Sequence, residues 1–254
     1  MFPVLIDFGP LTIHTYGFFV ALGLLAGIFL AAREAKRLDI DGDKIIDMCF
    51  YIVVAAIVGS RLLFVIQNPE TFRAAPFEAF KIWKGGLVFY GGFAGALLVV
   101  LIYLKIYRLP LGKVADIAAL SIPLGHFIGR MGCFFAGCCY GKTCDCLWAI
   151  TFKHPEALAP LHMPLHPTQL YESSANLMIF LILFFSRHRK QYHGQLFLIY
   201  VMLYGGVRSV IEIFRGDFRG ESVLSILSVS QAIGISLSFA AVVMLIIFRK
   251  KTLS

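Results

Sequence analysis

Seven long apolar stretches constrain this chain more than any other feature of its sequence. They cover residues 13–32, 45–66, 86–107, 114–138, 168–186, 194–214 and 225–248. A helix needs about 20 apolar residues to cross the hydrocarbon core of a membrane, and each stretch is close to that length. The sequence therefore predicts an all-α, polytopic integral membrane protein with about seven transmembrane helices.

Composition supports the same fold class. Hydrophobic residues make up 59% of the 254 positions and charged residues 15%, whereas soluble proteins average about 45–50% and ~25%. This difference excludes an ordinary soluble domain, and the apolar content excludes a disordered chain. We expect one transmembrane domain over residues 1–254, with two longer segments between helices at about 67–85 and 139–167.

The positively charged residues predict how the chain lies in the membrane. Successive loops divide into one side with thirteen Lys and Arg residues and one side with seven. Because Lys and Arg collect in cytoplasmic loops, we predict the N-terminus outside and the C-terminus inside. Topology thus accounts for the net charge of +8, and we expect no nucleic-acid partner. Both longer segments fall on the outer side, which places the active site toward the outer face.

Three arginines fall inside the predicted helices, namely Arg61, Arg130 and Arg208. Charged side chains within membranes are rare and usually functional. A guanidinium group suits a phosphodiester because it is always charged and donates hydrogen bonds in a fork. Arg130 and Arg208 therefore predict a site for a phospholipid headgroup. A purely structural role remains the alternative for each, and it is strongest for Arg61.

Two further residues lie one helical turn from these arginines. Glu212 follows Arg208 by four positions, so the two side chains share a helix face and are predicted to pair. His126 precedes Arg130 by four positions on the same face. His126 is therefore a candidate base, with a structural hydrogen bond as the alternative.

Five motifs together resemble the prolipoprotein diacylglyceryl transferase family. They are YG at 16–17, GGLVFYGG at 85–92, GRMGCFFAGCCYG at 129–141, HPTQLYE at 166–172 and YGGVRSVIEIFR at 204–215. They occur in the family's order and cover nearly the whole chain. HPTQLYE and the two arginine motifs are specific, whereas the glycine pairs alone are a weak signal.

The resemblance implies a seven-helix enzyme of the bacterial inner membrane. Such an enzyme moves the diacylglyceryl group of phosphatidylglycerol onto the thiol of a lipobox cysteine in a prolipoprotein signal peptide and releases glycerol phosphate. The implied partners are phosphatidylglycerol, these signal peptides and membrane lipids, and no cofactor is implied. Several residues match family positions for catalysis or substrate binding: Arg130, Arg208, Tyr16, Tyr204, Glu212 and Gly141.

Some positions depart from the family's pattern. Many members have His where this chain has Tyr90, Asn in place of Cys133, and Glu in place of Cys138. The acceptor thiol must lose its proton before it can attack, so another base is needed. The candidates left open are His126, His166, Tyr90 and Glu212. These departures also favour, as an alternative, a divergent Cys-rich paralogue with another lipid donor or acceptor.

Five of the six cysteines lie between positions 133 and 146. At an oxidising outer face they predict one or two disulfides, with Cys133 near the substrate site. Thiol chemistry in this cluster is a second possibility, which would make the chain a membrane thiol-redox protein. A metal site with His154, His162 or His166 is a third. The spacing is not a double CxxC, so we expect no metal.

Overall fold

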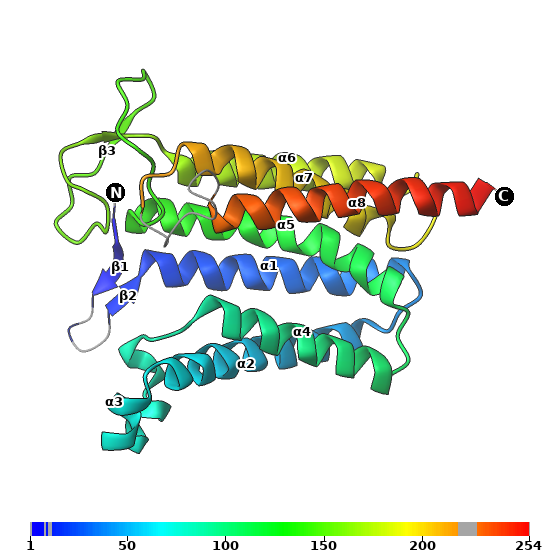
Figure 1. Cartoon of the computed structure of the whole chain (residues 1–254), viewed down its shortest axis with the longest axis horizontal. Coiled ribbons are helices and arrows are strands. Elements are labelled where there is room, and N and C mark those ends of the chain that lie inside the picture. The colour runs from blue at the N-terminus through cyan, green and yellow to red at the C-terminus, as the bar shows by residue number, and fades with distance from the viewer. Residues whose placement is uncertain (1, 8, 10–11, 218–227, 254) are drawn as a thin grey trace. The chain divides into compact units, whose positions relative to one another are not determined.

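The computed structural model describes residues 2–7, 9, 12–217 and 228–253 (Figure 1). Seven of its helices are long and apolar enough to cross a membrane, which confirms the predicted fold class. These helices are α1 (Thr15–Arg37), α2 (Gly42–Gln67), α4 (Phe89–Ile106), α5 (Leu111–Ala136), α6 (Thr168–Ser186), α7 (Gln195–Ile213) and α8 (Val229–Leu253). The predicted start of the last stretch, at 225–227, lies outside the described residues.

Glycines with positive φ correct two predicted helix ends. Helix α4 begins at Phe89 rather than at 86, because Gly85 and Gly86 have φ of +81° and +74°. Helix α5 ends at Ala136 rather than at 138, because Gly137 has φ of +75°. A glycine in this left-handed conformation commonly ends a helix. Cys138 therefore lies in the loop after α5 and not in the membrane-spanning helix.

Four short strands were not predicted. Strands β1 (Val4–Asp7) and β2 (Thr12–His14) pair antiparallel before α1, and β3 (Ile150–Thr151) and β4 (Pro164–Leu165) pair antiparallel in the segment between α5 and α6. That second segment has a small apolar core of its own, made of Phe152, Ala159 and Leu165. The strands add to an otherwise helical architecture.

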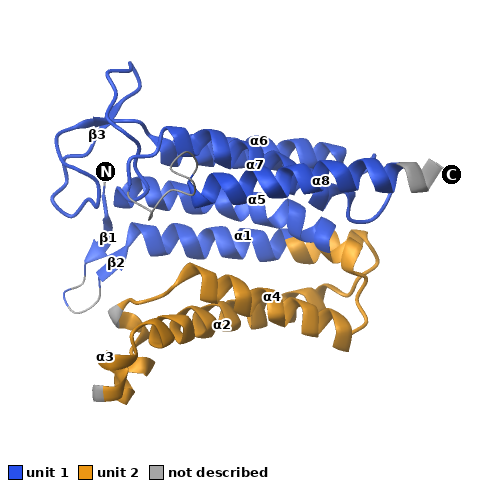
Figure 2. Cartoon of the chain, viewed as in Figure 1, with its two compact units in different colours: residues 1–30, 115–254 blue, residues 31–114 orange. Residues whose placement is uncertain are grey.

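The chain divides into two compact units, coloured in Figure 2. Unit 1 comprises residues 1–30 and 115–254, and unit 2 comprises residues 31–114. Helices α1 and α5 each contribute residues to both units. The expected single transmembrane domain therefore stays a prediction, and each unit is described by itself.

Small residues allow the helices of unit 1 to approach closely. A Cβ atom at Gly23 of α1 would lie 2.7 Å from the carbonyl oxygen of Gly125 on α5. A Cβ atom at Gly205 of α7 would lie 2.5 Å from the carbonyl oxygen of Gly234 on α8. Close approach of this kind is the usual basis of helix packing in membranes. The buried core beside these contacts consists of Leu30, Ala119, Leu120, Ile179, Leu183, Leu196 and Tyr200.

A buried carboxylate fixes the start of α7 in unit 1. Asp116 of α5 accepts hydrogen bonds from the backbone nitrogens of Leu196, at 3.0 Å, and Phe197, at 3.4 Å. Lys190 Nζ lies 2.6 Å from the same carboxylate. An anion at a helix N-terminus satisfies backbone donors that lack partners within the helix. Asp116 therefore positions α7, the helix that carries Arg208 and Glu212.

Unit 2 contains α2 and α4 with a short connecting segment. A Cβ atom at Gly59 of α2 would lie 2.4 Å from the carbonyl oxygen of Gly91 on α4, so these helices also meet at glycines. The connection contains α3 (Pro69–Ala74), η1 (Pro76–Phe80) and η2 (Ile82–Lys84). Its aromatic residues Phe77, Phe80 and Trp83 are at least three-quarters exposed. Exposed aromatics among charges suit a segment at a membrane interface.

Candidate active site

Arg61 of unit 2 uses every donor it has on the backbone of its own unit. Its Nε donates to the carbonyl oxygen of Ala79 at 2.8 Å, and its two Nη atoms donate to the carbonyl oxygens of Glu78, Lys81, Gly85 and Gly86 at 2.6–3.3 Å. A guanidinium has five N–H donors, and these bonds occupy five. The arrangement supports the structural role, in which Arg61 holds residues 78–86.

Unit 1 contains a different arrangement, centred on Glu172 of α6. Arg130 Nε of α5 lies 2.7 Å from one Glu172 oxygen, and Arg208 Nε of α7 lies 3.4 Å from the other. Arg215 Nη1, just after α7, lies 3.8 Å from the first oxygen. Glu172 is 2% exposed. One buried carboxylate thus joins three guanidinium groups from three parts of unit 1, and we call Arg130, Glu172, Arg208, Glu212 and Arg215 the arginine cluster.

Glu212 is the second carboxylate of the arginine cluster. It pairs with Arg208 Nη1, as the spacing predicted, and its other oxygen accepts a hydrogen bond from Ser228 Oγ at 3.1 Å. Arg215 Nε lies 3.9 Å from the oxygen that pairs with Arg208. Positions 208, 212 and 215 recur at helical spacing, which places them on one face.

Arg215 is held from outside the cluster as well. Its Nε and Nη2 each donate to a carboxylate oxygen of Asp217 at 2.8 Å. Burial disfavours the charged form of Arg215, but the hydrogen bond to Asp217 and the neighbouring Cys139 outweigh it and raise the pKa of the guanidinium. Arg215 is therefore a permanent, fixed positive charge.

Exposure distinguishes the three arginine side chains. The side chain of Arg130 is 20% exposed, that of Arg208 10% and that of Arg215 3%. A ligand can therefore reach Arg130 most easily and Arg215 least. This gradient suits a site in which Arg130 and Arg208 contact an anion and Arg215 supports them with its charge.

Aromatic residues line the arginine cluster. The ring of Tyr204 on α7 lies 5.6 Å from that of His126, which precedes Arg130 by one turn on α5. Tyr16 of α1 packs against α5 two positions from Arg130, since a Cβ atom at Gly132 would lie 3.2 Å from the Tyr16 carbonyl oxygen. The structure thus brings together six predicted site residues from unit 1, namely Tyr16, His126, Arg130, Tyr204, Arg208 and Glu212.

Gly141 and His166 lie in the segment that follows α5. The Gly141 nitrogen donates to the carbonyl oxygen of His166 at 3.0 Å, and Gly216, next to Arg215, donates to the carbonyl oxygen of Tyr140 at 3.1 Å. A Cβ atom at Gly141 would lie 2.5 Å from His166 Cβ, so this position requires glycine for steric reasons. Gly141 therefore belongs to the junction at which residues 140–141 pair with residues 215–216, and this junction holds the backbone of Arg215.

The described contacts of His166 are with the same segment, the first turn of α6 and the end of α7. His166 Nδ1 lies 3.1 Å from the Tyr171 hydroxyl and 3.8 Å from Cys146 Sγ, and its ring packs on Phe214. Tyr90, the remaining candidate, lies in unit 2 on the first turn of α4 and is 60% exposed.

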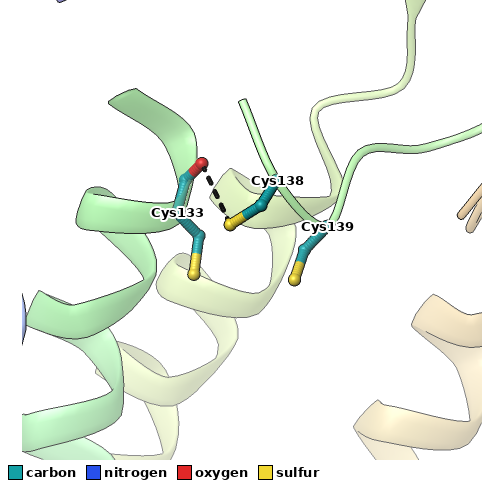
Figure 3. Close-up of side chains that lie close together, drawn as sticks. All are labelled: Cys133, Cys138 and Cys139. Carbon is teal, nitrogen blue, oxygen red and sulfur yellow. Dashed lines mark hydrogen bonds between the residues drawn. The ribbon is translucent and has the colours of Figure 1, made fainter. Parts of the chain in front are cut away.

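The five cysteines between positions 133 and 146 form two separate groups. Cys144 and Cys146 make a disulfide, in agreement with the predicted disulfide between positions 133 and 146. Cys133, Cys138 and Cys139 are thiols, and their three Sγ atoms lie within 4.8 Å of one another (Figure 3). Cys133 follows Arg130 by three positions on α5, and Gln169 and Thr168 of α6, the helix that carries Glu172, donate to the carbonyl oxygens of Cys138 and Cys139. The thiol group therefore borders the arginine cluster.

An apolar groove of about 580 Å³ lies between α6 and α7 in unit 1. Its lining is Tyr171, Ala175, Leu203, Gly206, Val207, Val210, Ile211 and Phe214. Val207 and Ile211 flank Arg208 and Glu212 in sequence. The helix that carries Arg208 and Glu212 therefore forms one wall of the groove, and the apolar lining suits an acyl chain.

Sequence reasoning did not select Glu172 or Arg215 as site residues. Glu172 was the last residue of HPTQLYE, and Arg215 was counted as a loop charge at the end of YGGVRSVIEIFR. The spacing of Arg215 from Arg208, two helical turns, was the available signal. No local spacing could pair Glu172 with arginines on other helices.

Comparisons with known proteins agree with the motifs. The profile of the family described as prolipoprotein diacylglyceryl transferase matches residues 3–247. A phosphatidylglycerol–prolipoprotein diacylglyceryl transferase of Clostridium tetani is 36% identical over 236 residues, which cover 92% of this chain and 93% of that protein. A protein of the same name from Trichormus variabilis is 34% identical over 99% of this chain and 92% of its own length. These similarities do not favour the paralogue or thiol-redox alternatives.

Proposed function

The chain belongs to the prolipoprotein diacylglyceryl transferase family, and from this premise we propose that it lipidates prolipoproteins. In this reaction the diacylglyceryl group of phosphatidylglycerol moves to the thiol of a lipobox cysteine, and glycerol phosphate leaves. The observation that carries the proposal is the arginine cluster, in which two guanidinium groups with exposed surface share one buried carboxylate.

The arginine cluster supplies what the departing phosphate needs. Arg130 and Arg208 contact the phosphodiester, while Glu172 and Glu212 fix the orientation of both guanidinium groups. When the bond between the diacylglyceryl carbon and the phosphate oxygen breaks, the phosphate gains a second negative charge. Donors already held in place stabilise that charge without reorganising, and such stabilisation is usually the largest contribution to catalysis. Tyr204, which packs on His126, and Tyr16, which packs beside Gly132 of α5, are assigned to the same site.

The substrate's other parts are assigned by chemistry. An acyl chain of phosphatidylglycerol fits the apolar groove between α6 and α7. Of the four candidate bases, Glu212 belongs to the arginine cluster, and His126 packs on Tyr204 one turn before Arg130 on α5. These two are therefore the first to test for removal of the acceptor's proton. His166 and Tyr90 have described contacts elsewhere and follow them.

We assign the protein to the bacterial inner membrane as a multi-pass enzyme, with its N-terminus and active site toward the outer face. Seven apolar helices and the unequal division of Lys and Arg between the two sides support this placement. Cysteine accessibility labelling of intact cells, and of inverted membrane vesicles for the other side, tests the orientation.

The test of the function uses purified protein in phosphatidylglycerol nanodiscs with a lipobox peptide. We expect lipidated peptide and released glycerol phosphate in equal amounts. Arg208→Ala should abolish both, and Arg61→Lys should retain them per folded molecule. Absence of glycerol phosphate release by folded wild-type protein, or full activity of Arg208→Ala, would contradict the proposal.

A further inference from the structure

Three thiols meet at the end of α5 in unit 1. Cys133 lies on the last turn of α5, and Cys138 and Cys139 follow the turn made by Gly137. Figure 3 shows the three sulfur atoms side by side, with Cys138 Sγ 3.8 Å from the carbonyl oxygen of Cys133. Cys133 is buried, whereas Cys138 and Cys139 are half-buried. A small ligand can therefore reach the group from the side of the loop.

The backbone holds these sulfurs together. Gly137 turns the chain at φ of +75°, and Cys139 has φ of +59° although it is not a glycine. Few non-glycine residues adopt this conformation. The turn returns the chain to α5 and brings residues 133 and 139, six positions apart, to the same place.

The spacing of the sulfurs suits a metal ion. All three Sγ atoms lie within 4.8 Å of one another. Zinc binds thiolate sulfur at about 2.3 Å, so three sulfurs on one tetrahedral zinc ion are about 3.8 Å apart. The sulfurs need to move together by at most about 1 Å. Three protein ligands with an open fourth position are the usual pattern of a catalytic zinc site.

Charge supports binding at this place. Three thiolates and one Zn²⁺ carry a net charge of −1, and Arg130 lies one turn before Cys133 on the same helix. The other group of possible ligands, Cys144, Cys146 and His166, does not offer two thiolates, because its cysteines form the disulfide. The candidate is thus the group that borders the arginine cluster.

We propose that Cys133, Cys138 and Cys139 bind Zn²⁺ through their thiolates, and that the acceptor cysteine of the prolipoprotein occupies the fourth position. The second half of this inference rests on the proposed function. It departs from the expectation of no metal, which was drawn from sequence spacing alone. It also supplies a role for Cys133 and Cys138 at positions where many family members carry other residues.

Each proton, bond and leaving group of the proposed reaction has a defined place. Zinc binding releases the protons of the three protein thiols, and the acceptor thiol loses its own proton to water when its sulfur binds the metal. The bound thiolate attacks the diacylglyceryl carbon, and a carbon–sulfur bond forms. The carbon–oxygen bond to phosphate breaks, and glycerol phosphate leaves with the electron pair and a second negative charge. The product thioether is a neutral, weaker ligand, so it dissociates.

Cobalt titration of the full chain in nanodiscs tests the metal site. Under a thiol reductant that does not bind metals, we expect one Co²⁺ per chain with the intense visible spectrum of tetrahedral thiolate ligation. Cys139→Ser should weaken binding by more than about 10-fold, whereas Cys139→His, which restores a ligand, should recover it. Cys49→Ser, on α2 of unit 2, is the matched control and should bind as wild type does.

Two results would overturn the metal site. One is a Co²⁺ spectrum that is the same in wild type and Cys139→Ser. The other is a disulfide among Cys133, Cys138 and Cys139 in the protein as isolated from membranes without reductant, found by peptide mass spectrometry. Circular dichroism of each variant checks that it is folded.

The acceptor's place is tested with the cobalt-loaded protein. A lipobox peptide should change the Co²⁺ charge-transfer band, and a peptide with Ser in place of its cysteine should not. If wild-type protein freed of metal by a chelator transfers lipid at the full rate, the zinc role is wrong and the proposed function stands. If metal-loaded protein binds Co²⁺ as expected but transfers no lipid, the metal site stands and the proposed function fails.

Discussion

The buried guanidinium groups of Arg61 in unit 2 and of the arginine cluster in unit 1 have different kinds of partner. Arg61 is 8% exposed and Arg208 is 9% exposed, so burial does not distinguish them. Arg61 gives all five donors to backbone carbonyls of residues 78–86. The cluster arginines are held by carboxylates from other parts of unit 1, and Arg130 retains exposed surface. A saturated arginine holds structure, whereas an arginine with exposed donors can bind a ligand.

The comparison also explains why the anion site is not simply the place with most positive charge. Glu172 and Glu212 neutralise much of the cluster, yet they fix the guanidinium groups in position. Fixed donors cost no reorganisation when charge develops on a phosphate.

Replacing the exposed arginine should have the largest effect. The Arg130 guanidinium pairs with Glu172 through Nε, and its other nitrogens remain for the phosphate. Arg130→Lys removes this fork of donors. We expect kcat for glycerol phosphate release to fall by about 10²–10³-fold, with the protein still folded. Arg61→Lys serves as the control. Equal losses of kcat in both variants would remove the distinction between the two regions.

Removing the shared counter-charge should damage both stability and catalysis. Glu172→Gln leaves three guanidinium groups without their common carboxylate, and breaking a buried pair costs about 3–5 kcal/mol. We expect a lower free energy of unfolding in denaturant titrations and slower transfer. Glu70→Gln, at an exposed position in unit 2, should change neither. A Glu172→Gln protein as stable as wild type would show that the network is not coupled.

Removing the saturated arginine should cost stability and leave chemistry intact. Arg61→Ala deletes five hydrogen bonds to carbonyls. Each hydrogen bond to a charged group is worth about 1.5–3 kcal/mol and the bonds are not additive, so we expect a loss of about 3 kcal/mol or more. Proteolysis within residues 76–86 should become faster. A large fall in kcat per folded molecule would instead place Arg61 in the active site.

A pair of glycine substitutions tests the junction that carries Arg215. Gly141→Ala places a Cβ atom 2.5 Å from His166 Cβ, whereas a Cβ atom at Gly129 meets nothing within 4 Å. Overpacking costs about 1–3 kcal/mol, so Gly141→Ala should lower the melting temperature and reduce transfer several-fold. Gly129→Ala should be neutral or slightly stabilising. Identical melting temperatures of the two variants would contradict the described junction.

Much of the fold could be predicted because apolar stretches of about 20 residues have few alternatives to membrane helices. The helix ends were less predictable, since Gly85, Gly86 and Gly137 stop helices through backbone conformation rather than through hydropathy. The pair of Arg208 and Glu212 followed from helical spacing. Glu172 and the thiol group could not be derived, because they depend on contacts between helices and on a loop that turns back.

On the proposed function, the arginine cluster holds the phosphate of phosphatidylglycerol and Arg61 does not. Native mass spectrometry of protein released from nanodiscs with equal phosphatidylglycerol and phosphatidylethanolamine measures the retained lipid directly. We expect wild type and Arg61→Lys to retain phosphatidylglycerol, and the Arg130→Ala, Arg208→Ala double variant, checked as folded, to lose it. Retention by the double variant equal to that of wild type, or loss in Arg61→Lys alone, would contradict this expectation.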